Sequence, residues 1–178
     1  MKKLAHDAIP RVAPANIGEV VRFPIVVLLE DIRSAHNVGA ILRTADALLV
    51  REVLLAGITP GGDHKGVHKS ALGAQDFVPW RRIESTTSEI KHLKTLGYTV
   101  AALEITDSPQ PTESLLIGAY PICLVVGNEV AGISEATLNE CDFALELPQL
   151  GVKQSLNVSI ATAVMMFDLQ RRYRTLTQ

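Results

Sequence analysis

The chain contains 178 residues, of which 47% are hydrophobic and 20% are charged, and its formal net charge is −2 at pH 7. This length allows one domain with a real hydrophobic core, and the composition excludes an intrinsically disordered protein. The mild acidity excludes a protein that binds nucleic acid through a global positive field, and 4% aromatic residues argue against a surface that stacks several bases. A shaped RNA site built from a few local basic residues remains compatible with this composition.

Neither the cysteines nor the hydropathy indicate a secreted or membrane protein. The two cysteines, Cys123 and Cys141, provide no disulfide framework, and Cys123 lies in an apolar run where we expect a core residue. The N-terminus lacks the apolar stretch of a signal peptide, and every apolar run is shorter than the roughly 18 residues that a membrane span needs. We therefore expect a cytoplasmic protein without membrane contact.

The first half of the chain predicts an arm followed by two strands and a helix. Residues 1–22 are mixed in character and are expected to form an N-terminal arm. The β-branched run 24–30 is typical of a strand buried on both faces, and 51–57 predicts a second one. Between them, apolar residues recur at helical spacing over 38–49. Residues 58–78 lack a clear period and predict a long loop, which in a compact domain usually has a function.

The second half continues the alternation of helices and strands. Thr86 and Glu89 form a capping-box pair that predicts a helix ending at Gly97, and Ser134 is expected to cap a short helix ending at Cys141. The other predicted elements are strands at 98–104, 121–127 and 143–147, a turn near 113–117, and a helix from about Ser155 to Tyr173.

This alternation predicts one domain, residues 23–178, of the α/β class, with a mostly parallel sheet covered by helices on both faces. In such sheets, ligands bind beyond the carboxyl ends of the strands. We therefore expect the functional loops to be those that follow Glu30, Glu104, Gly127 and Leu147.

Common cofactor and metal motifs are missing. No G-x-G-x-x-G follows a strand, and the segment GGDHKG (61–66) lacks the Lys-Ser/Thr pair of a phosphate-binding loop. His64 and His68 stand four residues apart, but they have no convincing third ligand, so we interpret them as surface histidines and expect no metal. The spacings also show no nucleophile triad.

The first of the expected functional loops leads into the helix at 38–49. Asn37 can cap that helix, and Gly39 permits the close approach of another segment or a ligand. Arg43 lies on the flank of the apolar stripe, where an ordinary helix accepts any polar residue. Taken alone, this segment favours a structural interpretation.

Two later segments make a stronger case for a site. In GNEVAGIS (127–134), the glycines allow a ligand to lie against the backbone, and Glu129 is placed where a strand tip meets a crevice. In the segment 147–159, Ser155, Asn157 and Ser159 interrupt an apolar helix start, and buried polar groups need hydrogen-bond partners. Ser155 can serve as the helix cap, which leaves Asn157 unexplained.

Together these segments resemble the SpoU (TrmH-type) branch of the SPOUT RNA methyltransferases. NVGAILRTADAL (37–48) is similar to the first motif of that family, GNEVAGIS to the second and LPQLGVKQSLNVSIATAV (147–164) to the third. VHKSALGA (67–74) is similar to the family's loop before its middle strand. The resemblance covers about Pro24 to Arg172, and its three motifs stand in the same order as in the family.

The resemblance implies a SPOUT-like fold with a C-terminal trefoil knot, a homodimer, and methylation of a ribose 2′-hydroxyl in tRNA or rRNA with S-adenosylmethionine as donor. It implies Arg43 as the catalytic arginine, with polar partners at Asn37, Glu129, Ser155 and Asn157. The implied donor-binding residues are Leu103, Gly127, Gly132, Leu147 and Leu156.

Two other functions stay open at this point. One is a non-catalytic RNA-binding or assembly module that keeps the fold, and the other is an α/β domain that binds an unrelated small molecule. Binding of S-adenosylmethionine separates the last from the others, and methyl transfer to RNA separates the enzyme from the module. Many relatives carry an extra RNA-binding domain or basic extensions, and the mild acidity of this chain weakens a purely electrostatic interaction with RNA. The candidates for RNA recognition are a dimer-wide surface, the region from Lys65 to Arg82, or a partner protein.

Overall fold

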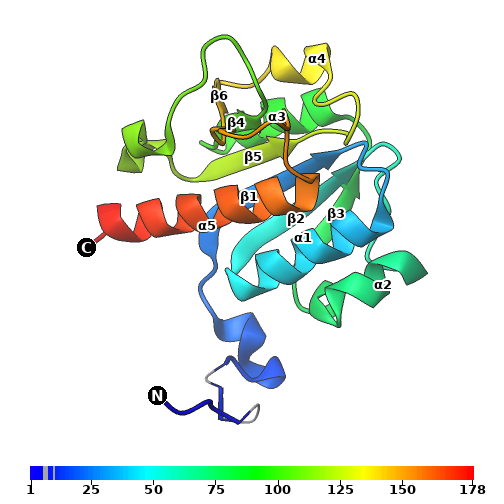
Figure 1. Cartoon of the computed structure of the whole chain (residues 1–178), viewed down its shortest axis with the longest axis vertical. Coiled ribbons are helices and arrows are strands. Elements are labelled where there is room, and N and C mark those ends of the chain that lie inside the picture. Colours follow the sequence, from blue (N-terminus) through cyan, green and yellow to red (C-terminus); the bar gives the residue numbers. More distant parts are fainter. Residues whose placement is uncertain (6–7, 10) are drawn as a thin grey trace.

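A computed structural model describes residues 1–5, 8–9 and 11–178. It contains a six-stranded sheet in the order β3-β2-β1-β5-β4-β6, and all five strand pairings in the described part of the chain are parallel (Figure 1). The predicted α/β class is therefore confirmed. The strands are β1 (Phe23–Glu30), β2 (Val50–Ala56), β3 (Trp80–Ile83), β4 (Thr99–Leu103), β5 (Ile122–Val126) and β6 (Phe143–Leu145).

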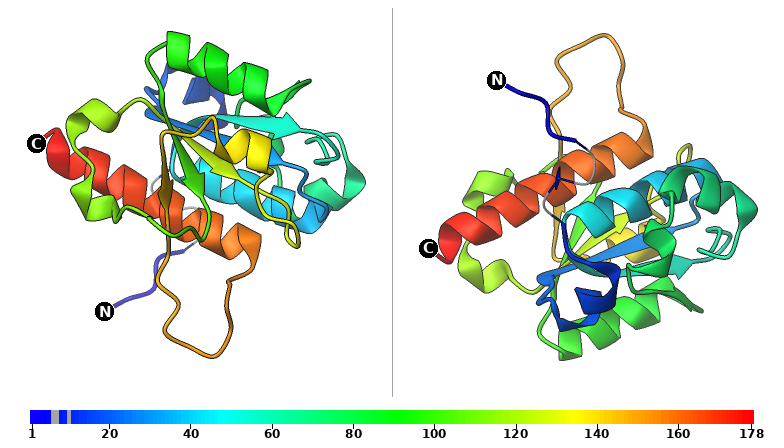
Figure 2. Two further views of the ribbon diagram at one scale, coloured as in Figure 1. Left: turned by 90° about the horizontal axis from the view of Figure 1, so that it is seen from above. Right: turned by 90° about the horizontal axis from the view of Figure 1, so that it is seen from below.

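Helices cover both faces of the sheet, as the alternation of elements predicts. On one face lie α1 (Ala35–Ala47), α2 (Lys65–Ala71) and α5 (Val158–Leu176), and on the other lie α3 (Thr86–Thr95) and α4 (Glu135–Leu138) (Figure 2). Successive residues of a strand point to opposite faces, so β1 supplies Ile25, Val27 and Leu29 to the core under α1 and α5. Its residues Val26 and Leu28 belong to the core under α3.

Short 3₁₀ helices in the described part of the chain include Pro14–Glu19, Ala74–Asp76, Thr112–Ser114 and Ile117–Ala119. Among the described residues, no helix combines the length and the apolar character needed to cross a membrane. Cys123 is fully buried in the core, as predicted, and Cys141 is partly buried.

The short strand β6 lies between the strand β4 and the connection that follows β4. On one side it pairs with β4. On the other side its Ala144 carbonyl accepts a hydrogen bond of 2.8 Å from the backbone N–H of Gln110, which lies in the connection between β4 and β5. The chain then leaves β6, forms a projecting loop over residues 146–157 and returns as α5 to pack on α1 and β1 (Figure 2). Residues 104–121 thus form a loop around the C-terminal segment.

The helix α2 and the strand β3, both in the region 58–83, were not predicted. The expected long loop contains α2, whose cap is the His64 side chain: its Nδ1 atom accepts a hydrogen bond of 3.0 Å from the Gly66 backbone N–H. Only a few residues of α2 are buried, so the apolar period of this helix is too short to detect. The edge strand β3 is also short, and its two central residues are exposed arginines, Arg81 and Arg82.

The predicted caps of α1 and α3 were wrong by one or more residues. Ser34, rather than Asn37, caps α1, and its side chain accepts a hydrogen bond from the Asn37 backbone N–H. Ser85, rather than Thr86, caps α3. Glu89 forms no capping box, because its carboxylate pairs with Arg81.

The two caps in the last part of the chain had different outcomes. Ser134 caps α4, as predicted. Ser155 does not cap α5, because the helix begins only at Val158 and Asn157 occupies the cap position. The amide oxygen of Asn157 accepts hydrogen bonds from the backbone N–H groups of Ser159 and Ile160, which explains the polar residue that the sequence left unexplained.

Candidate functional site

A cavity of about 230 Å³ lies beyond the carboxyl ends of β4, β5 and β6. Its walls come from three segments far apart in the sequence: the end of β4, the turn after β5, and the loop between β6 and α5. All five residues predicted to bind the donor line it: Leu103, Gly127, Gly132, Leu147 and Leu156. Two of the predicted polar partners, Glu129 and Ser155, line it as well.

Two glycines shape the turn after β5. A Cβ atom on Gly127 would lie 2.2 Å from the Gly132 carbonyl carbon and 2.3 Å from the Ile133 nitrogen, so no side chain fits there. Gly132 has φ +71°, in the left-handed region that favours glycine. The turn is closed by a pair of backbone hydrogen bonds of 3.0 and 2.9 Å between Asn128 and Gly132. The cavity wall at this point is therefore bare backbone.

The cavity is acidic and partly apolar. Three carboxylates line it, those of Glu104, Glu129 and Glu146, and the described lining includes no lysine or arginine. Aliphatic side chains from all three segments share the surface with these acids. A ligand that carries positive charge beside an apolar group suits this lining, whereas a phosphate would meet carboxylates without a compensating cation.

Glu129 is held by donors from the loop after β1. Its Oε2 atom accepts a hydrogen bond of 2.9 Å from the Arg33 backbone N–H. Its Oε1 atom accepts bonds of 3.1 Å from the Ser34 backbone N–H and 2.8 Å from the Asn37 amide. Partial burial opposes ionisation, but these donors outweigh it and hold the pKa of Glu129 below its ordinary value. Glu129 is therefore a fixed anion at neutral pH.

Asn37 joins this carboxylate to the third segment. While its amide NH₂ group donates to Glu129, its Oδ1 atom accepts a hydrogen bond of 3.2 Å from the Asn157 amide. Asn157 in turn accepts a hydrogen bond of 2.6 Å from the Ser159 hydroxyl at the start of α5. The chain of contacts from Glu129 through Asn37 to Asn157 thus links all three sequence motifs at one point.

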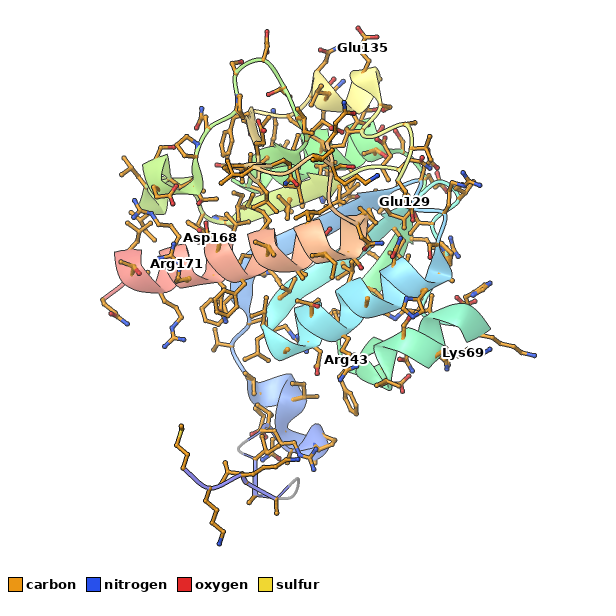
Figure 3. All side chains as sticks on the ribbon, viewed as in Figure 1. Arg43, Lys69, Glu129, Glu135, Asp168 and Arg171 are labelled. Carbon is orange, nitrogen blue, oxygen red and sulfur yellow. The ribbon has the colours of Figure 1, made fainter. Side chains whose placement is uncertain are left out.

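The remaining two predicted polar residues lie differently. Ser155 lies in the exposed loop before α5 and faces the cavity. Arg43 does not line the cavity of its own chain, since it stands on the exposed side of α1, nearly two turns after Asn37. In Figure 3 it lies on the side of α1 near α2, away from Glu129. No ion pair of Arg43 occurs among the residues that the structure describes.

Two polar residues that support the site were not predicted from the sequence. The Asn128 amide donates a hydrogen bond of 2.7 Å to the Asp31 carbonyl and accepts bonds from the Val130 and Ala131 backbone N–H groups, so it builds the turn that carries Glu129. Glu104 accepts a hydrogen bond of 3.0 Å from the Ile133 backbone N–H. Its position at the carboxyl end of a strand was a signal that could have identified it.

Comparison with known proteins points to one family. Residues 24–167 match the SpoU rRNA methylase family. Over 147 residues the chain is 32% identical to an uncharacterized tRNA/rRNA methyltransferase of Archaeoglobus fulgidus, covering 83% of this chain and 64% of that protein. Over 148 residues it is 31% identical to the tRNA (guanosine(18)-2′-O)-methyltransferase of Escherichia coli, covering 83% of this chain and 63% of that enzyme. The chain therefore spans less than two thirds of either relative.

The fold has counterparts among solved structures. The AdoMet-bound rRNA methyltransferase of Sinorhizobium meliloti superimposes with a TM-score of 0.77 at 27% sequence identity, over 90% of this chain and 61% of that one.

Proposed function

The chain belongs to the SpoU rRNA methylase family, and on this premise we propose that it transfers a methyl group from S-adenosylmethionine to a ribose 2′-hydroxyl of tRNA or rRNA. The observation that carries the proposal is the convergence of three distant segments on one acidic, partly apolar cavity at the carboxyl end of the sheet. The hydrogen bonds from Glu129 through Asn37 to Asn157 support it, since they hold the walls of this cavity against α1.

The cavity lining fits S-adenosylmethionine. This molecule carries a sulfonium and an ammonium group, which the carboxylates of Glu104, Glu129 and Glu146 complement. Leu103, Leu147 and Leu156 offer apolar surface for its adenine ring, and the turn from Gly127 to Gly132 offers backbone groups that can recognise the ring edge. When bound, the donor supplies a methyl group that is already activated for in-line displacement.

Glu129 acts in this proposal as a positioning residue. Its two oxygens already accept three hydrogen bonds, and its lowered pKa makes it a weak base. It therefore anchors the loop after β1 to the turn after β5, and another group must assist removal of the proton from the 2′-hydroxyl.

Arg43 is the group assigned to the reacting oxygen. A guanidinium remains protonated in proteins, so Arg43 favours the alkoxide by its charge or clamps the neighbouring phosphate, and the proton leaves through phosphate or water. Because Arg43 lies outside the cavity of its own chain, this assignment requires a second copy that presents its arginine to the cavity of the first.

An exposed apolar face supports such a homodimer. On α5, Ile160, Val164 and Phe167 recur at helical spacing and are each about half exposed, at 53%, 47% and 59%. Helix α1 packs beside α5 on the same side of the sheet and exposes Arg43 and Ala47. A twofold axis near this face would bury the apolar side chains and exchange the two arginines between copies.

Two measurements test the proposal together. Calorimetry measures binding of S-adenosylmethionine, and incubation with donor labelled in its methyl group measures transfer to unfractionated tRNA and rRNA, with nucleoside mass spectrometry identifying a 2′-O-methyl product. We expect both binding and transfer. Binding of RNA without transfer would instead support the assembly module, and failure to bind the donor would contradict both the cavity assignment and the enzyme.

A further inference from the structure

We propose that four exposed residues around the first turn of α1, which is joined to the cavity wall through Asn37 and Glu129, bind the phosphate backbone of the substrate RNA. These residues, the basic strip, are Arg33 in the loop after β1 and Lys65, His68 and Lys69 on the outer side of α2. The inference rests on the proposed function and adds to it the surface that holds the strand next to the methylated ribose.

Tight packing fixes α2 against α1, whose first turn carries Asn37. A Cβ atom on Gly39 of α1 would lie 2.5 Å from the Val67 carbonyl oxygen of α2, so the two helices touch backbone to backbone. Gly66 makes a second close approach, since its Cβ would lie 2.8 Å from the Cβ of Ala35 at the start of α1. The Ser70 hydroxyl also donates a hydrogen bond of 3.0 Å to the His36 carbonyl. The orientation of α2 relative to the site is therefore fixed by backbone contacts.

Two members of the strip are tied through the backbone to residues that shape the site. The backbone N–H of Arg33 holds Glu129, while the Arg33 side chain is exposed. Lys65 stands next to Gly66, which packs on the first residue of α1, and Lys69 extends from α2 into solvent (Figure 3). Packed helices lie about 8–10 Å apart, so α2 is within reach of nucleotides that flank a ribose bound near Asn37 and Glu129.

The charges of the strip are not used by the protein itself. Among the described residues, no carboxylate lies within ion-pairing distance of Arg33, Lys65 or Lys69. The two lysines of α3 are paired instead: Lys91 with Glu140 at 3.0 Å and Lys94 with Asp142 at 2.7 Å. The cations of the strip are therefore free to meet an external anion.

Helix electrostatics also argue against a purely local role. Lys65 occupies the first position of α2, where the helix dipole disfavours a cation. Lys65 and Lys69 are four residues apart on one side of the helix, and like charges at that spacing destabilise it. The first turn of α2 contains no acidic residue, and Lys65 forms no ion pair with Asp63, the nearest acid in the sequence; Lys69, in the last turn, meets only the repulsion from Lys65. Phosphate diesters of RNA supply the missing negative charge.

The test removes two charges from the strip and compares them with two charges removed from the opposite side of the sheet. The variant Lys65→Gln/Lys69→Gln loses two strip cations, and the control Lys91→Gln/Lys94→Gln loses two lysines of α3. Binding of labelled unfractionated tRNA is titrated from 50 to 200 mM KCl, with total rRNA in a parallel series to distinguish the two sources of RNA. Calorimetry with S-adenosylmethionine checks the cavity in each protein.

We expect the strip variant to bind the preferred RNA roughly tenfold more weakly at 50 mM KCl, with a slope of log affinity against log salt reduced by about 1.4 to 1.8. Its affinity for the donor should be unchanged, and the control should match the wild type. If the strip variant and the wild type have equal RNA affinity and equal salt dependence, the proposal that the basic strip binds RNA is overturned.

The same experiment separates failure of the strip from failure of the proposed function. If the strip variant loses salt-dependent binding but the wild type transfers no methyl group, the strip stands and the enzyme assignment fails. If the wild type transfers methyl groups and the strip variant binds RNA normally, the enzyme assignment stands and the strip fails. If the wild type binds neither RNA, both are overturned.

Discussion

The two sides of the sheet differ in how they use charge. On the side of α3 and α4, three basic residues are paired: Arg81 contacts Glu52 at 3.1 Å and also Glu89, and the two lysines of α3 pair with Glu140 and Asp142. On the side of α1 and α2, Arg43, Lys65 and Lys69 have no ion pair among the described residues. The ion pair of Arg171 with Asp168 lies near the C-terminal end of α5, far from Glu129 (Figure 3).

This difference shows why net charge is a poor guide to binding here. The net charge of −2 sums over the whole chain and does not show that the two sides of the sheet differ. Paired charges on one side contribute little field, while the unpaired cations on the other side are free to act on an external anion. The predictions below test whether the first surface serves stability and the second serves RNA binding and catalysis.

The largest expected effect comes from adding a side chain at Gly127, in the turn after β5. Gly127→Ala places a methyl group 2.2 Å from the Gly132 backbone, so the turn must open or the strand must shift. We expect a loss of about 3 kcal/mol in the free energy of unfolding, measured by urea denaturation, and loss of donor binding. Gly118→Ala is the control, because a Cβ there meets nothing within 4 Å. Normal donor binding by Gly127→Ala would contradict the assigned cavity wall.

A second test compares the loss of Arg43 with the loss of Arg81, one arginine from each side of the sheet. Arg43→Ala should lower methyl transfer about 100-fold, because it removes the positive charge assigned to the reacting oxygen. Its free energy of unfolding should change by less than about 0.5 kcal/mol, since no ion pair is lost. Arg81→Ala should do the reverse, leaving transfer unchanged and costing up to about 1 kcal/mol. Near-normal transfer by Arg43→Lys would show that charge alone suffices and that the guanidinium shape is irrelevant.

A third test places the same new charge on each side. Asn37→Asp sets a carboxylate at the position from which the amide contacts Glu129 at 2.8 Å, so two anions replace a hydrogen bond. We expect a loss of about 2 kcal/mol in the free energy of unfolding at pH 7 and a fall in methyl transfer. Asn139→Asp, at the end of α4, should cost about 0.5 kcal/mol and leave transfer intact. Equal effects at the two positions would contradict the role of Asn37 as a link.

The smallest expected effect is on stability at low pH, through protonation of Glu129. Because the pKa of Glu129 lies below its ordinary value of 4.5, its ionised form stabilises the folded state above that pH, and this contribution is lost as the pH falls through the lower value. Below about pH 4.5, wild type should therefore lose free energy of unfolding more steeply than Glu129→Gln. The effect is small because Glu129 is exposed. Glu135→Gln on α4 is the matched control, and identical acid profiles for wild type and Glu129→Gln would remove the assigned anchoring role.

Much of the fold could be predicted because its signals are local. The apolar runs identified five of the six strands, and the alternation with helices gave the parallel sheet. The similarity to solved SpoU structures confirms the predicted SPOUT fold with its C-terminal knot. The strand β3 and the helix α2 escaped prediction because they are short, and because α2 depends on packing between Gly39 and Val67 that no local pattern reveals.

Part of the candidate site could also be predicted because its signals are local in the sequence. Glycines and carboxylates at strand ends are visible in the sequence, and all five predicted donor-binding residues line one cavity. The environment of Arg43 was not predictable from its motif, because whether a helical residue faces its own cavity or solvent depends on where the other helices pack. The pairing of charges is likewise a property of the folded surface, since Arg81 meets Glu52 only when β2 and β3 lie side by side.

The enclosed position of β6 has a mechanical consequence. The strand β6 is held between β4 and Gln110, which belongs to the connection between β4 and β5. Tension applied at the two ends of the chain therefore draws this connection tighter around the threaded C-terminal segment. An unfolding machine that pulls the polypeptide through a narrow pore from its C-terminus therefore meets a constriction that grows with force. Release requires the last helix to slide backward out of the loop, a motion opposite to the direction of pulling.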